Sequence, residues 1–322
     1  MKSWVFQSKD DAGGWVEQDS SALPDEPVHV RVTHSGLNYK DALSLTRTAP
    51  ISKQFPMVPG IDLVGVVLSD ASGTFQPGEK VVATGYGLGE KFWGAYSEEA
   101  RLKPEWLVRL PAGLGEEQAA AVGTSGLTAA MCIDALERHG IRPDQGKVLV
   151  TGASGGVGSY ATWLLNEAGY SVVAATGRKS EAAYLTEIGA AEILDRAELE
   201  GQPRPLGKER WRAAVDVAGG AVLANVLASI EYGGAVAACG LVASMALPTS
   251  VAPFILRGVS LLGVDSVMAG ADTRARAWDR IARTASSFPF DRTTSVHPFS
   301  DVSRLAQALL AQELRGKAVL RW

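Results

Sequence analysis

The 322-residue chain has only two cysteines, four histidines and no block of basic residues. Cys132 and Cys239 are too few for a disulfide framework, which favours a reducing cytoplasm. With 31 basic and 35 acidic residues and a formal net charge of −4, the chain offers nucleic acid no cationic surface. No apolar run stands out as a membrane span, and the N-terminus turns polar too early for a secretory signal. We therefore expect a cytoplasmic protein with neither a nucleic-acid nor a membrane partner.

The same scarcity argues against a metal site. Zinc requires three or four thiolate, imidazole or carboxylate ligands close together. The possible soft and imidazole ligands are scattered along the chain without ligand spacing: His29, His34, Cys132, His139, Cys239 and His297. The sequence therefore predicts no metal.

The length fits two domains, and the pattern of predicted elements changes along the chain. Residues 1 to about 110 contain short predicted strands, and the alternation in VHVRVTH indicates a half-buried antiparallel strand. From residue 147, buried-type strands alternate with helical segments, as in a parallel sheet with helices on both faces. The tail, SRLAQALLAQEL followed by KAVLRW, is expected to return to the first domain. The predicted divisions are 1–122, 123–269 and the returning 270–322.

A glycine-rich segment, TGASGGVG (151–158), follows the predicted strand KVLV and precedes a helix. Such a turn offers backbone N–H groups and the positive end of a helix dipole to a pyrophosphate. Ala153, Gly155 and Gly158 align with the dinucleotide-binding fingerprint, with alanine in place of the first glycine. A glycine-rich turn without a ligand is the alternative. We predict that a dinucleotide contacts the turn at Ser154, Gly155, Gly156, Val157 and Gly158.

The end of the second strand indicates which dinucleotide binds. An NAD site usually has an Asp or Glu about 20 residues after the fingerprint, where it binds the ribose 2′-hydroxyl. Thr176 and Gly177 occupy that position here, and Arg178 follows. A carboxylate repels a 2′-phosphate whereas a guanidinium binds it, so the sequence favours NADPH. Arg196, after the third strand, is a further candidate for this pocket, although both arginines also suit a solvated surface.

A β-rich domain ahead of a dinucleotide-binding domain resembles the medium-chain dehydrogenase/reductase superfamily. The resemblance implies an α/β protein with a GroES-like β-rich catalytic domain and a Rossmann domain, a doubly wound parallel sheet. In the zinc alcohol dehydrogenases of that superfamily, a Cys ligand and the His of PGHE stand where this chain has GLNYKD (36–41) and PGID (59–62). There is no cysteine in the first segment and Ile61 replaces the histidine, so we expect a zinc-free enzyme. The superfamily also implies a homodimer paired through the sixth strand.

Six short segments are similar to one group of that superfamily, the quinone oxidoreductase-like, NADPH-dependent acrylyl-CoA reductases. They are NYKDAL (38–43), FPMVPGID (55–62), TGASGGVG (151–158), TGR (176–178), YGGAVAACGL (232–241) and LGVDSVM (262–268). The group implies reduction of the 2,3 double bond of a short 2-enoyl-CoA, acryloyl-CoA to propanoyl-CoA. A zinc-free NADPH quinone or enone reductase and a non-catalytic NADPH-binding protein are the alternatives.

Tyr39 and Asp41 are the candidate catalytic residues. When hydride reaches the β-carbon of an enoyl thioester, negative charge develops on the thioester oxygen and needs a hydrogen-bond donor. Tyr39 lies where the zinc enzymes carry a metal ligand, so the resemblance implies that its hydroxyl faces the nicotinamide and is this donor. Asp41 is the second candidate, orienting Tyr39 or a water. Alternatively, Asn38 and Asp41 form a helix capping box and Tyr39 is a packed aromatic.

The resemblance implies further cofactor contacts outside the turn, from Tyr39, Leu241, Ile255, Ser266 and Gln312. Core packing is an equally good explanation of Leu241 and Ile255. Thr124 and Thr128 either touch the cofactor or cap and pack a helix.

The phosphates of an acyl-CoA substrate require a cationic rim. Arg47 and Lys53 border the proposed catalytic loop and are the candidates. Three aromatic side chains of GYGLGEKFWG either close over the substrate or pack in the core: Tyr86, Phe92 and Trp93.

Overall fold

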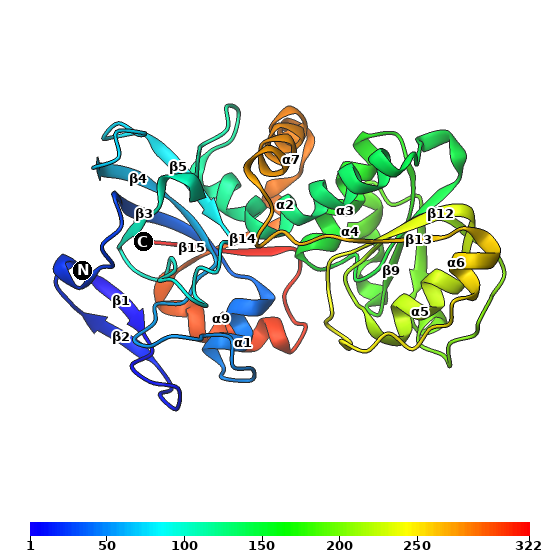
Figure 1. The fold of residues 1–322 in the computed structure, drawn as a ribbon, viewed down its shortest axis with the longest axis horizontal. Helices are drawn as coiled ribbons and strands as arrows, with labels where there is room; N and C mark the ends of the chain where they lie inside the picture. The colour runs from blue at the N-terminus through cyan, green and yellow to red at the C-terminus, as the bar shows by residue number, and fades with distance from the viewer. The chain divides into compact units, whose positions relative to one another are not determined.

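The computed structural model describes all 322 residues, which form two units (Figure 1). Unit 1 consists of Met1–Ser125, Val267–Ala271 and Phe290–Trp322. Unit 2 consists of Gly126–Ser266 and Asp272–Pro289.

This division differs from the predicted ranges at residues 123–125 and 267–269, which belong to unit 1, and at residues 272–289, which belong to unit 2 and not to the returning tail. This last range includes most of helix α7 (Ala271–Thr284), in which Trp278 and Ile281 are buried. Arg280 of α7 forms an ion pair with Glu137 of the same unit. The apolar stripe of an amphipathic helix shows that it covers a core, but not which core, so the sequence pattern left this assignment undetermined.

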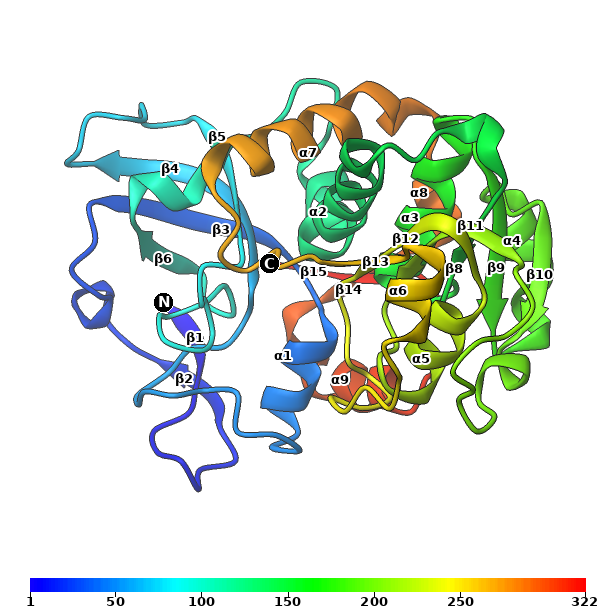
Figure 2. The same ribbon diagram turned by 45° about the vertical axis from the view of Figure 1, so that its right-hand side comes forward.

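Unit 2 is built on a six-stranded parallel sheet in the order β10-β9-β8-β11-β12-β13. Numbered along the chain, this is the 3-2-1-4-5-6 order of doubly wound nucleotide-binding folds. The strands are Lys147–Val150 (β8), Ser171–Thr176 (β9), Glu192–Asp195 (β10), Trp211–Asp216 (β11), Ile230–Ala238 (β12) and Ser260–Gly263 (β13). Four helices pack against them (Figure 2): Gly156–Glu167 (α3), Ala182–Glu187 (α4), Gly220–Ala228 (α5) and Ala252–Arg257 (α6).

The strands of unit 2 are buried because helices cover the sheet. In β9 every residue after Ser171 is buried. Helix α3 buries an unbroken run from Gly158 to Leu165. The predicted Rossmann fold is therefore confirmed. In such folds ligands bind at the carboxyl ends of the parallel strands.

Unit 1 is built on a seven-stranded sheet in the order β14-β15-β3-β4-β5-β7, with β6 also paired to β3. All its strand pairs except β14–β15 are antiparallel. The strands are Val28–Gly36 (β3), Asp62–Asp70 (β4), Lys80–Thr84 (β5), Glu99–Leu102 (β6), Leu107–Arg109 (β7), Thr294–Pro298 (β14) and Lys317–Arg321 (β15), with a separate hairpin of Lys2–Val5 (β1) and Gly14–Glu17 (β2). The helices are Tyr39–Leu45 (α1), Phe290–Thr293 (α8) and Val302–Leu310 (α9).

The C-terminal tail belongs to unit 1, as the sequence predicts. Strand β15 pairs with β3 in antiparallel register, with Val319 opposite Gly36. Helix α9 packs against α1. This return places Lys317, the first residue of β15, beside the end of β3.

Helix α2 (Glu116–His139) is long and apolar enough to cross a membrane by length and composition. The expectation that no segment has this character is therefore wrong. However, 83% of its most apolar window is buried, as in the core helix of a folded protein. The helix is interrupted at Gly123, where φ is 41° and ψ is −148°.

Candidate functional site

The glycine-rich turn lies between β8 and α3 in unit 2, as predicted. Gly152 has a φ of 57°, so this glycine, which precedes the aligned Ala153, supplies the tight left-handed turn. A Cβ at Gly158 would lie 2.3 Å from the Gly152 carbonyl oxygen, so glycine is needed for α3 to approach the strand. A Cβ at Gly155 would meet no atom closer than 3.4 Å, so this exposed glycine leaves space for a ligand.

Three predicted cofactor residues come together beside this turn. One guanidinium nitrogen of Arg178 donates to Ser154 Oγ over 3.0 Å and to the Ser154 carbonyl over 3.3 Å. The hydroxyls of Ser154 and Thr176 lie 3.2 Å apart, and the Arg178 amide donates to Thr176 Oγ1 over 3.1 Å. These bonds hold the guanidinium at the carboxyl ends of β8 and β9.

Arg196 lies at the same edge of the sheet. A Cβ on Gly177 would be 3.0 Å from the Arg196 guanidinium carbon, which shows how closely the two approach. Two of the cations at this edge are paired with carboxylates: Lys179 with Asp195 at 3.5 Å and Arg196 with Glu200 at 2.6 Å.

A buried carboxylate that the sequence analysis overlooked fixes the neighbouring strand end. Asp216, the last residue of β11, accepts hydrogen bonds from Thr151 Oγ1 at 2.7 Å and from the Gly219 amide at 2.8 Å. Burial raises the pKa of Asp216, and these hydrogen bonds oppose the shift. The contact joins β8 to β11, where the winding of the sheet reverses and ligands bind in such folds. An Asp closing the apolar strand AAVDVA was the available signal.

The remaining unit 2 candidates are exposed or held by hydrogen bonds. Ser266 lies beyond the end of β13 and accepts from Thr128 Oγ1 over 2.7 Å. Arg274 donates to the Ser266 carbonyl over 2.8 Å. Leu241 and Ile255 are 58% and 73% exposed. Core packing, the alternative explanation for these two side chains, is therefore wrong.

In unit 1, Tyr39 is the first residue of α1 and is 40% exposed, so it is not a packed core aromatic. Asp41 is 2% exposed and caps the helix, since its Oδ2 accepts from the Asn38 amide over 2.9 Å. Its Oδ1 accepts from the Ile61 amide over 3.0 Å. No hydrogen bond joins Asp41 to Tyr39. The structure thus supports the capping alternative for Asp41, which holds the start of α1 in place.

Asn38 connects this cap to a buried charge pair. Its side-chain nitrogen Nδ2 donates to Asp62 Oδ2 over 2.8 Å, and its side-chain oxygen Oδ1 accepts from Lys317 Nζ. Lys317 lies 3.4 Å from Asp62 Oδ2, and the two side chains are 3% and 1% exposed. Thr124 donates to Asp62 through its amide at 3.0 Å and its hydroxyl at 2.6 Å. We call Asn38, Asp41, Asp62, Thr124 and Lys317 the buried polar cluster.

The interruption in α2 belongs to the same cluster. A Cβ on Gly123 would lie 2.2 Å from Asp62 Oδ2. Glycine therefore permits both the left-handed backbone and the close approach that directs the Thr124 amide at the carboxylate.

The cluster contains two carboxylates and one ammonium group. Burial, followed by repulsion from Asp62, raises the pKa of Asp41 to about 7. Burial lowers the pKa of Lys317, and attraction to Asp62 opposes that shift. The cluster is electrically neutral when Asp41 carries a proton, which is why a second buried carboxylate is tolerated beside Asp62. Neither Asp62 nor Lys317 was singled out from the sequence.

The predicted cationic rim is engaged locally. The Arg47 guanidinium donates to the Lys9 carbonyl and lies 5.9 Å from the Phe55 ring centroid. Lys53 Nζ donates to the Pro50 carbonyl over 3.0 Å.

The last unit 1 candidates lie on two loops. Gln312 follows α9 and has a φ of 60°. Tyr86 stacks on Trp106 with centroids 6.0 Å apart, and Phe92 lies 4.7 Å from the same ring. Trp93 donates its indole N–H to the Pro56 carbonyl over 2.8 Å. Phe92 nevertheless stays 37% exposed, so this cluster is not entirely core.

Neither unit contains a group of three or more His, Cys, Asp or Glu side chains placed to hold a metal ion. At the position of the zinc enzymes' histidine, the Ile61 amide binds Asp41 instead. The donor set at this place is therefore suited to hydrogen bonding and not to zinc coordination.

We predict that Lys317→Met destabilises unit 1 by about 3–5 kcal/mol, because Asp62 stays buried without its cation. The double variant Lys317→Met/Asp62→Asn removes both charges and is expected to recover more than half of that loss. Urea unfolding of Lys317→Met, of Asp62→Asn and of the double variant measures the free energy of unfolding of each. A double variant as unstable as the sum of the two single variants would contradict the coupling.

Two family models match the chain: the alcohol dehydrogenase GroES-like domain at residues 24–112 and the zinc-binding dehydrogenase domain at residues 156–283. The chain is 45% identical to the probable acrylyl-CoA reductase AcuI of Escherichia coli, over 94% of this chain and 93% of the relative. It is 47% identical to the acrylyl-CoA reductase AcuI of Ruegeria pomeroyi, over 92% and 91%. It is also 45% identical to the putative quinone oxidoreductase YhfP of Bacillus subtilis, over 81% and 79%.

A solved structure is similarly close. The yhdH oxidoreductase of Salmonella enterica, crystallised in complex with NADP, superposes with a TM-score of 0.96 at 44% identity and covers 100% of both chains. The matches extend through both units, and the predicted fold class is confirmed by this neighbour. The chain belongs to the medium-chain dehydrogenase/reductase superfamily, in the quinone oxidoreductase-like group that contains the acrylyl-CoA reductases.

Proposed function

We propose that the protein is an NADPH-dependent reductase of short 2-enoyl-CoA thioesters that converts acryloyl-CoA to propanoyl-CoA. The observation that carries the proposal is the 45–47% identity to two acrylyl-CoA reductases over more than nine tenths of the chain. The relative named as a quinone oxidoreductase keeps a quinone or enone reductase as the second candidate.

The residues of unit 2 suit NADPH. Gly155 leaves the turn open above the start of α3, where backbone N–H groups and the helix dipole favour a pyrophosphate. Arg178, fixed by Ser154 and Thr176, is the proposed partner of the 2′-phosphate, with Arg196 beside it. The predicted contacts of the remaining cofactor are Leu241, Ile255 and Ser266 in unit 2, and Tyr39 and Gln312 in unit 1.

When bound, NADPH would supply a hydride to the β-carbon of the enoyl thioester, and the α-carbon of the resulting enolate takes a proton from a side chain or from water. The Tyr39 hydroxyl is the proposed donor to the thioester oxygen as negative charge develops there. The buried polar cluster fixes the first turn of α1, and thereby the backbone of Tyr39, before substrate arrives. Such preorganisation avoids the cost of orienting the donor during the reaction. Asp41 is thus a positioning residue.

We further infer a cytoplasmic location. Both cysteines are free, although the Cys132 and Cys239 thiols are close enough to hydrogen-bond. The bond to Cys239 and burial raise the pKa of Cys132, which keeps its thiol protonated and unreactive. A reducing compartment suits two neighbouring thiols that remain unbridged.

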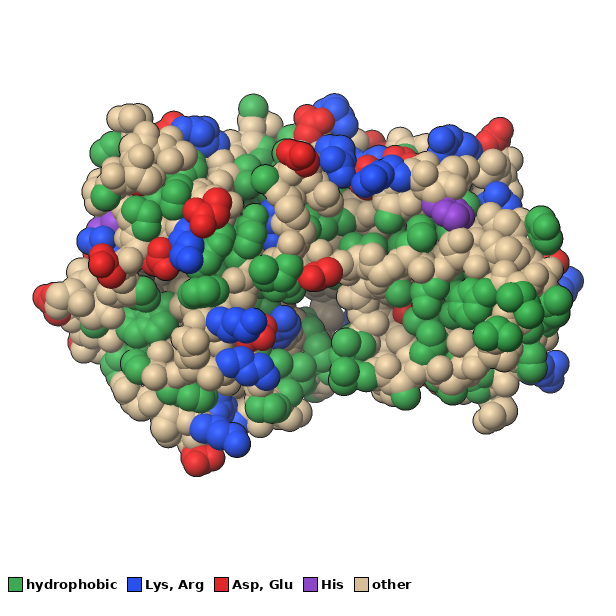
Figure 3. Space-filling view, viewed as in Figure 1, with side chains coloured by type: hydrophobic (Ala, Val, Ile, Leu, Met, Phe, Trp, Pro, Cys, Tyr) green, Lys and Arg blue, Asp and Glu red, His purple; other side chains and the backbone are tan.

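We also propose a homodimer formed through the edge of unit 2. Strand β13 has no partner on its outer side, and an unpaired edge can extend a sheet into a second copy. Hydrophobic side chains gather on the surface of unit 2 that carries α5 and α6 (Figure 3). Leu261 of β13 and Leu256 of α6 are exposed, and so are Val242, Met245 and Val251 on the segment between β12 and α6. An exposed apolar area of this kind favours self-association.

The proposed activity is tested by following NADPH oxidation with acryloyl-CoA, crotonyl-CoA and a quinone side by side. The proposal predicts the highest kcat/KM for acryloyl-CoA. A higher value for the quinone would establish the second candidate. No turnover of any of the three would support a non-catalytic NADPH-binding protein.

Arg178→Ala is expected to weaken NADPH binding by about 10- to 100-fold, the value of a charge-assisted hydrogen bond. NADH binding should change by less than about threefold, because NADH lacks the 2′-phosphate. Fluorescence titration with both cofactors measures the difference, with the exposed Arg204→Ala as the matched control. Equal losses for NADPH and NADH would remove Arg178 from the phosphate site.

Tyr39→Phe is expected to lower kcat for acryloyl-CoA by about 100-fold, as found when one oxyanion donor is removed. The NADPH affinity should stay close to that of the wild type, because the ring remains. The control is Tyr232→Phe, which removes a hydroxyl from a 71% exposed tyrosine of unit 2. An unchanged kcat would show that the Tyr39 hydroxyl does not stabilise the enolate.

The dimer is tested by sedimentation equilibrium. The wild type should have twice the 33.9 kDa mass of one chain, and Leu261→Lys should shift it towards the single-chain mass by placing a charge at the paired edge. A wild-type protein of single-chain mass would refute the dimer.

A further inference from the structure

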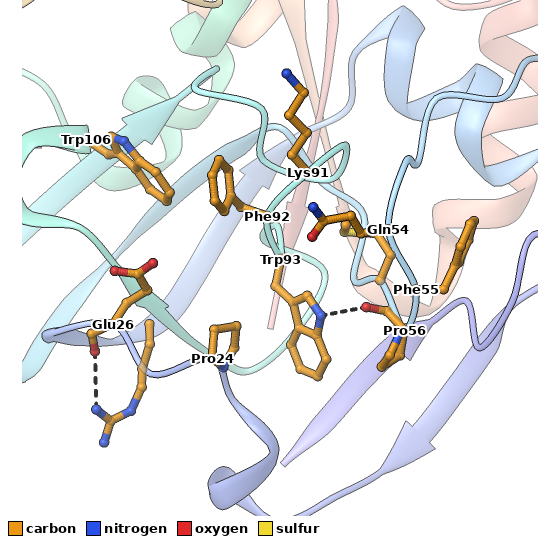
Figure 4. A pocket seen from close by; sticks show the side chains of 11 residues that line it. Pro24, Glu26, Gln54, Phe55, Pro56, Lys91, Phe92, Trp93 and Trp106 are labelled. Atoms are coloured by element: carbon orange, nitrogen blue, oxygen red, sulfur yellow. Dashed lines mark hydrogen bonds between the residues drawn. The ribbon is translucent and has the colours of Figure 1, made fainter.

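Unit 1 contains a pocket of about 220 Å³ that none of the predicted cofactor contacts occupies (Figure 4). Its walls come from three loops around residues 24–26, 54–57 and 91–93 and from β6 and the short turn after it. Figure 4 shows Phe92 between Trp106 and Trp93, with Gln54 and Lys91 beside them. The volume is below the range for a whole drug-sized ligand, so the pocket fits one ring system of a larger molecule.

The aromatic walls are held in place without a ligand. Trp93 is fixed by its indole bond to the Pro56 carbonyl at 2.8 Å. The Phe92 carbonyl accepts from the Gly89 amide at 2.7 Å, and the Phe92 amide donates to the Gly87 carbonyl at 3.1 Å. Phe92 packs at 53° to the Trp106 ring, yet 37% of it faces solvent. A flat π-face that is rigid and partly open is suited to stacking with a heteroaromatic ring.

Cations surround these rings. Lys103 Nζ lies 5.5 Å from the centroid of Phe92 and 5.3 Å from that of Trp106. Lys91 and Arg101 line the pocket, and Arg101 donates to the Glu26 carbonyl over 3.2 Å. Glu26 is the only acidic residue of the lining. The pocket thus combines aromatic faces with an excess of positive charge, which matches an aromatic ring attached to phosphate.

The pocket is tied to the helix that carries Tyr39. Glu90, next to Lys91, forms an ion pair of 3.5 Å with Lys40, the neighbour of Tyr39. The Glu90 carbonyl accepts from the Lys53 amide over 2.7 Å, which joins the two main loops of the pocket. The pocket and Tyr39 therefore belong to one framework within unit 1.

We propose that this pocket binds the adenine of the acyl-CoA substrate, with Lys91 and Lys103 beside its 3′-phosphate. The inference rests on the proposed function, since it assigns the non-reacting end of that substrate. An acyl-CoA carries its adenine nucleotide far from the reacting double bond, whereas a quinone has no nucleotide. Binding energy from such a remote group lowers KM and supports positioning of the reacting end.

The test compares acryloyl-CoA with acryloyl-N-acetylcysteamine, a thioester that lacks the nucleotide. Phe92→Ala should raise the KM for acryloyl-CoA by about 5- to 100-fold, the value of one stacked base, and leave kcat/KM for the short thioester within about twofold. Lys91→Glu should have the same selectivity, with an effect that shrinks at high salt. Lys208→Glu, an exposed lysine of unit 2, is the control.

Equal losses on both thioesters, or no loss on either, would overturn the pocket assignment while leaving the reductase activity established. A second measurement does not depend on turnover, so it tests the pocket even if neither thioester is reduced and the proposed function fails. Calorimetry with adenosine 3′,5′-bisphosphate, in saturating NADP⁺ to block the cofactor site, should show binding to the wild type. Binding that Phe92→Ala leaves unaltered, or no binding to the wild type, would refute the inference.

Discussion

The reactive end of unit 1 depends on one interaction, the buried ion pair between Lys317 and Asp62. Removing two charges from water is costly, and the pair is stable only because Asn38, Thr124 and Ser125 complete its hydrogen bonds. The pair connects the last strand of the chain to β4, the start of α1 and the break in α2. The exposed Tyr39 therefore projects from a backbone that the protein interior fixes.

Unit 2 solves a different electrostatic problem. Its sheet edge must attract a phosphate-rich cofactor without burying an unpaired cation. Arg178 is held by the hydroxyl and carbonyl groups of Ser154, which orient its guanidinium beside the glycine-rich turn. Asp216 stabilises the neighbouring strand end, because its two carboxylate oxygens accept hydrogen bonds from Thr151 and Gly219. Acidic and basic roles are thus separated along one edge, which is consistent with selection of NADPH over NADH.

Local patterns in the sequence predicted much of this, and long-range contacts account for what they missed. The six parallel strands and the turn at 151–158 follow from apolar runs and glycine spacing. The proposed role of Arg178 at the 2′-phosphate follows from its position about 20 residues after the fingerprint. Asp62 and Lys317 are 255 residues apart, and each alone is an ordinary charged residue at the end of a strand. Asp41 was a candidate catalytic residue. The sequence did not show that it is buried, because its two carboxylate oxygens accept from the backbone amides of Asn38 and of the distant Ile61. The fingerprint alignment placed Ala153 at the first glycine position, and it did not show that the preceding Gly152 has the positive φ.

The central claim is hydride delivery to the β-carbon of an enoyl thioester, and isotope transfer tests it most directly. The protein is given acryloyl-CoA and NADPH carrying deuterium at both C4 positions of the nicotinamide, and the propanoyl-CoA is analysed by NMR. The account predicts one deuterium at C3 and none at C2, and, with unlabelled NADPH in D₂O, one deuterium at C2. Propanoyl-CoA without label at C3, or NADPH oxidation with no saturated thioester formed, would contradict it.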